Sequence, residues 1–138
     1  MRRLAACLVL LGTLLLAGCA PGKATLSTDE ARPLTRAPIE AARVALTFDV
    51  TWGDGELRKI LAILQQNGAR ATFFVGGTFM NTQAPMIRYL VAQGHEVGTL
   101  GQRIVNVGSL PETEIKENLL ASQSVLGKTL GGPVRYFR

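Results

Sequence analysis

The 138-residue chain has few of the side chains that usually carry catalysis or bind metals. Its one histidine is His95, so a metal site built from imidazoles cannot exist in this chain alone. The glycines at 76–77 and 98–101 lack the spacing of a phosphate loop and its following Lys-Ser or Lys-Thr pair. No Gly-x-Ser-x-Gly elbow is present either. These absences argue against phosphate-loop nucleotide binding and against α/β-hydrolase chemistry.

Strong charge patterning is also missing. The chain carries 15 basic and 10 acidic residues, and they are scattered without a basic stripe or interleaved aromatic residues. A nucleic-acid partner is therefore not expected. A hydrophobic content of 47% argues against general disorder, and the length suits about one domain.

The first residues form a secretory signal. A basic start at 1–3 precedes an apolar run at 4–17, which is too short for a stable transmembrane helix. Leu-Ala-Gly-Cys at 16–19 resembles the lipobox of bacterial lipoproteins, which implies that Cys19 is lipidated and anchors the chain to the membrane of the bacterial cell envelope. The alternative is an ordinary cleaved signal with a chance cysteine. The other cysteine, Cys7, lies in the removed segment, so no disulfide is expected.

Three regions follow from this pattern. Residues 1–18 are the predicted lipoprotein signal peptide, and residues 19–42, with three prolines and mixed charges, are predicted to form a flexible tether. Residues 43–138 are the predicted domain. The expected strands cover residues 44–48, 71–75, 96–98 and 134–137. The expected helices cover about 57–64, a segment from near Thr82 to Gly94, and a long segment that opens with a capping box at 109–112 and ends at Gly131.

Alternation of strands and helices predicts an α/β fold with a parallel sheet. In such sheets, functional groups gather at the carboxyl ends of the strands. Asp49 ends the first expected strand, residues 99–106 follow the third and Arg138 follows the fourth. We therefore expect these positions to share one rim.

The stretch LTFDVTWGDG, residues 46–55, is the clearest candidate for chemistry on that rim. Asp49 and Asp54 could form an acid/base or metal-binding pair, but Asp54 is also well placed to cap the following helix. Trp52 is either an apolar platform for a sugar ring or a core residue beneath the loop. His95 is interpreted as a hydrogen-bonded turn residue rather than a catalytic one.

A resemblance to the polysaccharide deacetylases with a NodB-homology domain is carried by three segments: VALTFDVTWGDGELRKILAILQQNGARATFFVGG, VAQGHEVGTLGQRIVN and VRYFR. The first is most similar to the Trp-Gly-Asp subgroup of sporulation and cell-envelope members. The resemblance implies the N-terminal part of a deformed (β/α) barrel. It also implies a hydrolase that depends on a divalent, zinc-like metal ion and removes acetyl groups from cell-wall or chitin-like polysaccharides.

Site roles follow from the same resemblance. Asp49 matches the general base, and Arg138 matches an arginine that orients it. Val50 stands where the family has a metal-binding aspartate, and Asp54 is the candidate substitute ligand. Two metal-binding histidines are expected at the positions of Leu100 and Ile104, and neither side chain can coordinate a metal.

The missing histidines predict that no metal is bound and that deacetylase activity is weak or absent. The 96 residues of the domain are also too few for a closed barrel of about 250 residues. Three hypotheses follow. The chain is part of the sequence of a longer deacetylase, a non-catalytic glycan-binding lipoprotein of the envelope, or a decayed gene fragment.

Overall fold

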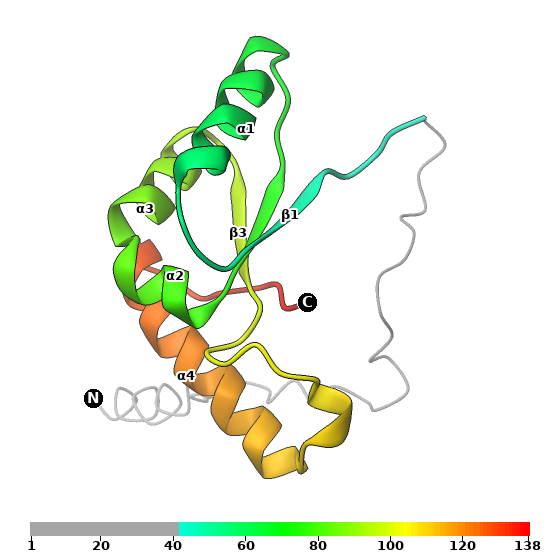
Figure 1. Ribbon diagram of the computed structural model, residues 1–138, viewed down its shortest axis with the longest axis vertical. Coiled ribbons are helices and arrows are strands. Elements are labelled where there is room, and N and C mark those ends of the chain that lie inside the picture. The colour runs from blue at the N-terminus through cyan, green and yellow to red at the C-terminus, as the bar shows by residue number, and fades with distance from the viewer. Residues whose placement is uncertain (1–41) are drawn as a thin grey trace, which may run out of the picture. The chain divides into compact units, whose positions relative to one another are not determined.

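The computed structural model describes residues 42–138, in which strands and helices alternate (Figure 1). The strands are β1 (Thr47–Val50), β2 (Thr72–Val75) and β3 (Glu96–Thr99). The helices are α1 (Gly55–Gln66), α2 (Gly77–Thr82), α3 (Ala84–Ala92) and α4 (Glu112–Leu130), with a 3₁₀ turn, η2 (Val107–Ser109), before α4. The predicted signal peptide, Cys19 and nearly all of the predicted tether lie outside the described residues.

The strands form a parallel sheet in the order β1-β2-β3. Asp49 pairs in register with Phe74, and Phe74 with Gly98. The last residues of the chain run beside β3, where the Thr99 N–H donates to the Tyr136 carbonyl at 2.9 Å and the Arg138 N–H to the Thr99 carbonyl at 3.2 Å. The strand predicted at 134–137 is therefore reduced to one bridge, between Thr99 and Phe137.

All four helices lie on one side of the sheet, and no described element covers its other side (Figure 1). Alternation along the strands turns Phe48, Phe73 and Val97 toward the helices, and the rings of Phe48 and Phe73 stack with centroids 5.2 Å apart. The core between the two layers is completed mainly by buried helical residues: Leu57, Leu61, Leu64, Phe79, Met80, Met86, Ile87, Leu90 and Leu126. The opposite face, which bears Asp49, stays open.

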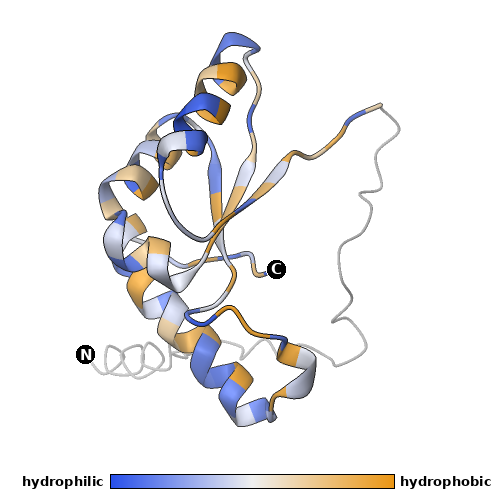
Figure 2. Ribbon diagram, viewed as in Figure 1, coloured by the Kyte–Doolittle hydropathy of each residue, from blue (hydrophilic) through white to orange (hydrophobic). Residues whose placement is uncertain are grey.

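The long helix buries two polar residues on the side that faces the core. Its buried residues are Asn118, Ser122 and Leu126, and Ile115 and Leu119 on the same side are half-buried. Asn118 is satisfied there, because its amide oxygen accepts from the Arg103 N–H at 2.6 Å and its amide nitrogen donates to the Arg103 carbonyl at 2.9 Å. The first half of α4 is largely hydrophilic, as Figure 2 shows.

One helix was missed and one capping motif was predicted wrongly. The helix expected from near Thr82 is α3, which begins at Ala84 with Pro85 in its first turn, where a missing N–H is tolerated. The short helix α2, just before it, was not predicted. The capping box at 109–112 does not form. Ser109 lies in η2, where its hydroxyl donates to the Asn106 carbonyl at 2.8 Å, and the N-cap of α4 is Pro111, which makes no side-chain cap.

The α/β fold with a parallel sheet is confirmed. Within residues 42–138, no helix combines the length and the apolar character that crossing a membrane requires.

Candidate functional site

Asp49 lies on the open face of the sheet, next to the last residue of β1. Its carboxylate is about half exposed, and Arg138 Nη1 lies 3.4 Å from Asp49 Oδ1. The same guanidinium nitrogen donates to Thr47 Oγ1 at 2.7 Å. The fold thus brings together two residues 89 positions apart, which the resemblance assigned to a base and its orienting arginine.

Arg138 reaches β1 across the ring of Phe74. Its guanidinium carbon lies 5.8 Å from the ring centroid, within the range of a cation–π contact. Phe74 in turn leans over Gly98, because a methyl group added at Gly98 would lie 2.7 Å from two carbons of the ring. Period-two alternation in β2, with Phe73 turned toward the helices, is the sequence signal that could have placed Phe74 in this site.

Asp54 is held by a neighbour rather than by the helix end. It occupies the N-cap position of α1 but makes no side-chain capping bond, so the favoured capping interpretation is wrong for its carboxylate. Instead, Asp54 Oδ2 accepts from Arg58 Nη2 at 2.8 Å and from Arg58 Nε at 3.1 Å. Its tentative role as a metal ligand would require this exposed ion pair to open.

Trp52 lies between the two aspartates in the β1–α1 loop. It is 83% exposed, so the alternative that it is a core residue beneath the loop is wrong. An exposed indole on a rim presents a flat apolar face with one N–H donor, which suits contact with a sugar ring.

Leu100 and Ile104 follow β3 on the same rim. The Leu100 N–H donates to the Val75 carbonyl at the end of β2, at 2.9 Å. Ile104 covers Gly76, because a methyl group added there would lie 2.6 Å from Ile104 Cδ1. The positions where the resemblance expects histidines therefore lie at the carboxyl ends of the strands and present apolar side chains.

The residues present do not fit a zinc-like ion. Among residues 42–138, no three His, Cys, Asp or Glu side chains are grouped closely enough to hold a metal. Asp49 and Asp54 are each paired with an arginine. Because a catalytic zinc takes about three protein ligands, two arginine-paired carboxylates are not a sufficient set.

His95 lies at the amino end of the sheet, away from this rim. It is buried, its Nδ1 accepts from the Ala71 N–H at 3.3 Å, and its ring meets Phe73 edge-on. Burial and, to a lesser degree, the Arg70 guanidinium lower the pKa of His95 from its usual 6.5. The interpretation of His95 as a hydrogen-bonded turn residue agrees with this geometry.

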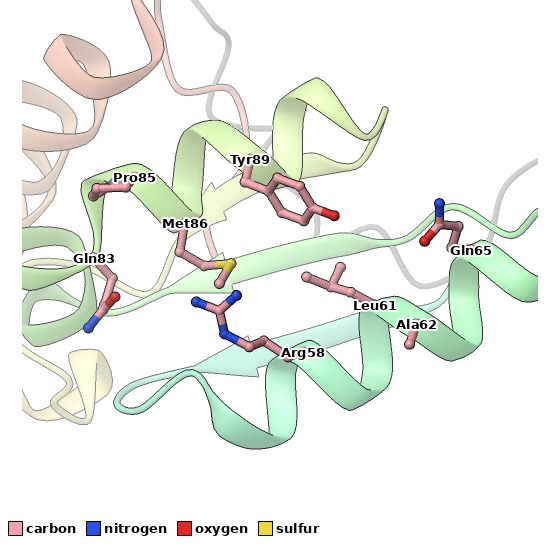
Figure 3. A pocket seen from close by; sticks show the side chains of 8 residues that line it. All are labelled: Arg58, Leu61, Ala62, Gln65, Gln83, Pro85, Met86 and Tyr89. Carbon is pink, nitrogen blue, oxygen red and sulfur yellow. The ribbon is translucent and has the colours of Figure 1, made fainter.

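A groove of about 370 Å³ lies between α1 and α3 in the helical layer (Figure 3). Leu61, Met86 and Tyr89 point into it, and Arg58 lies at its side. Its lining includes no acid and no histidine, so it is not the candidate catalytic site.

Comparison with known proteins supports the fold and the family. The family model described as polysaccharide deacetylase matches residues 36–138, a range that begins inside the predicted tether. The peptidoglycan-N-acetylglucosamine deacetylase of Bacillus cereus is 28% identical over 105 residues, which cover 73% of this chain and 37% of that protein. The chain spans about a third of the length of the curated relatives it matches.

Solved structures give the same result. A family 4 carbohydrate esterase from Bacillus anthracis matches with a TM-score of 0.63 and 28% identity, over 68% of this chain and 46% of that one. A family 4 pseudoenzyme from the same organism matches with a TM-score of 0.63 and 29% identity, over 67% of this chain and 33% of that one. The shared motifs, the parallel sheet and these matches agree: the chain belongs to the polysaccharide deacetylase family and corresponds to the N-terminal part of its deformed barrel.

Proposed function

We propose that this chain recognises a cell-wall or chitin-like polysaccharide and has weak or no deacetylase activity. The observation that carries the proposal is the rim, where Leu100 and Ile104 occupy the expected histidine positions. Both aspartates of the rim are paired with arginines. The reaction of the family depends on a metal, and this donor set does not provide for one.

The groups that remain suit sugar recognition. Trp52 offers an exposed apolar face, on which the C–H face of a pyranose ring can pack. Asp49 and Arg138 are each about half exposed and supply charged hydrogen-bonding groups on the open face. The name of the Bacillus cereus relative points to peptidoglycan N-acetylglucosamine as the sugar class.

Titration calorimetry with an N-acetylglucosamine oligosaccharide tests this role. Trp52→Ala should weaken binding at least about tenfold, because the stacking of a ring on an aromatic side chain contributes roughly 1–3 kcal/mol. Tyr89→Ala is the matched control, since Tyr89 is also an exposed aromatic residue but lies in the groove of the helical layer. Equal losses in the two variants, or no binding by the unmodified chain, would refute the proposed recognition.

Residual catalysis is the second candidate, and the retained Asp49–Arg138 pair favours it. Acetate release from the same acetylated oligosaccharide measures it directly. We expect acetate to be released at the background rate. Turnover that is lost in Asp49→Asn would instead establish a weak deacetylase.

We also propose that the chain is secreted across the cytoplasmic membrane and anchored at the bacterial cell envelope through Cys19, and the resemblance of residues 16–19 to a lipobox supports this. Labelling cells with a radioactive fatty acid should mark the chain and leave Cys19→Ser unlabelled. Cys7→Ser is the control, since Cys7 lies within the predicted signal. Labelling of Cys19→Ser would contradict the anchor.

A further inference from the structure

A second hollow, of about 240 Å³, lies beside His95 at the amino end of the sheet, and we call it the amino-end hollow. Its lining supplies several hydrogen-bond donors and no carboxylate. The polar side chains that line it are Gln65, Arg70, Tyr89, Gln93 and His95. A hollow with this lining suits a ligand that accepts hydrogen bonds and carries negative charge.

His95 is the buried donor of this hollow. It is 8% exposed, and its Nδ1 accepts from the Ala71 N–H, so the proton of the neutral ring is on Nε2. The lowered pKa of His95 keeps the ring in this neutral form at neutral pH. Within residues 42–138, no carbonyl or side chain accepts from the Nε2–H. Because a buried N–H without an acceptor is unfavourable, a ligand oxygen in the hollow would stabilise it.

The Arg70 guanidinium lies next to His95. A methyl group added at Gly94 would lie 3.3 Å from Arg70 Nε and 3.4 Å from Arg70 Cζ, so the guanidinium packs over the residue before His95. No carboxylate of the described chain pairs with Arg70. Glu96 lines a neighbouring hollow with Arg70, but its carboxylate accepts from Thr72 Oγ1 at 3.2 Å instead. A guanidinium beside an imidazole N–H is a suitable partner for a carboxylate.

An apolar groove continues from the amino-end hollow. Leu61, Gln65 and Tyr89 line both this hollow and the groove of about 370 Å³ between α1 and α3. Figure 3 shows the Tyr89 side chain extending along the groove toward Gln65, with Leu61 and Met86 pointing into the same space. A ligand whose charged end meets Arg70 would therefore place an adjoining apolar group against Leu61, Met86 and Tyr89.

We propose that the amino-end hollow binds a small carboxylate that bears an apolar group. The carboxylate accepts from the Arg70 guanidinium and from His95 Nε2–H, and the apolar group lies in the groove between α1 and α3. This site is separate from the rim that bears Asp49 and Trp52.

An NMR titration of the whole chain tests the site, because His95 is the only histidine and its ring nitrogens report on the hollow directly. Phenylacetate should shift Nε2. It should bind at least about tenfold more tightly than phenylacetamide, which has a similar shape and no charge. It should also bind at least about fivefold more tightly than acetate, which has no ring to bury. Ring nitrogens that do not shift in excess phenylacetate, or equal affinity for either of the other ligands, would overturn the proposal.

Two variants identify the groups that bind. Arg70→Gln should weaken phenylacetate binding at least about tenfold, because it removes the charged donor. Arg88→Gln is the matched control, since Arg88 is an exposed arginine of α3 that lines neither the hollow nor the groove. Tyr89→Ala should weaken the binding of phenylacetate and leave that of acetate unchanged. Equal affinities for phenylacetate in the two arginine variants would refute the assignment of the carboxylate to Arg70.

Discussion

Gly98 controls how closely Phe74 and the last residues of the chain approach on the open face. A methyl group there would lie 2.7 Å from the Phe74 ring and 2.9 Å from the Tyr136 carbonyl oxygen. Both contacts are shorter than atoms tolerate, and one of them is to the main chain, which cannot rotate away. The Arg138 guanidinium lies over this same ring and pairs with Asp49. The position of Arg138 therefore depends on Gly98, which leaves room for the ring.

Gly98→Ala should therefore lower the free energy of unfolding by about 1–3 kcal/mol, the usual cost of overpacking. Urea denaturation measures the change. Gly55→Ala is the matched control, because a methyl group at Gly55 meets nothing within 4 Å and alanine favours the start of α1. If both variants had equal stability, the close packing of Phe74 against Gly98 would be disproved.

At the scale of elements, β2 and β3 are joined at their amino ends through a histidine. The Ala71 N–H, just before β2, donates to His95 Nδ1, just before β3. This bond needs the unprotonated ring nitrogen. Because burial and Arg70 lower the pKa of His95 in the folded chain, the unfolded chain binds the proton first as the pH falls.

Stability should consequently fall as the pH drops below about 6.5, the usual histidine value, and should be insensitive to His95 above it. Urea midpoints at pH about 7.5 and about 5.5 measure this fall. In His95→Gln, whose amide oxygen can still accept a hydrogen bond, the difference between the two midpoints should shrink. An undiminished difference would assign the pH dependence to other groups.

The sequence predicted most elements because their signals are local. Short apolar runs predicted strands at β1 and β2, the short segment at 96–98 was predicted as a strand and matches β3, and the spacing of Leu57, Leu61 and Leu64 predicted α1. What was missed depends on contacts between residues that are distant in the sequence. Asn118 is buried on α4 through its hydrogen bonds to Arg103, and the fourth strand is reduced to a bridge beside Thr99.

The candidate site was predictable to a similar extent. Motif resemblance singled out Asp49 and Arg138, and the fold does bring them together. The parts played by Thr47, Phe74 and Gly98 were not predicted, because they depend on strand register and on which face each residue occupies. The ion pair that holds Asp54 depends on the rotamer of Arg58, which no motif specifies.

At the scale of the whole molecule, the chain combines the strand order of its family with a rim that lacks a metal-binding set. The family model covers residues 36–138, so the apolar residues at 100 and 104 lie inside a region that is otherwise recognisable. On the described rim, Trp52 is an exposed indole, and Asp49 and Asp54 are each paired with an arginine.

Restoring the missing donors should restore metal affinity. The double variant Leu100→His/Ile104→His adds two imidazoles on the rim beside the existing carboxylates, and it should bind zinc at least about tenfold more tightly than the unmodified chain. Titration calorimetry with zinc alone measures this. Arg88→His/Lys116→His is the control, with two histidines placed on α3 and α4. Equal zinc affinity in the two double variants would disprove the assignment of positions 100 and 104 to the rim site.

The most direct test of metal-independent recognition is the titration of an N-acetylglucosamine oligosaccharide into the unmodified chain, first in excess chelator and then in excess zinc. We expect the same dissociation constant in both solutions, because the groups proposed to contact the sugar are Trp52, Asp49 and Arg138, and none of them needs a metal. Binding that disappears in chelator and returns with zinc would contradict this expectation.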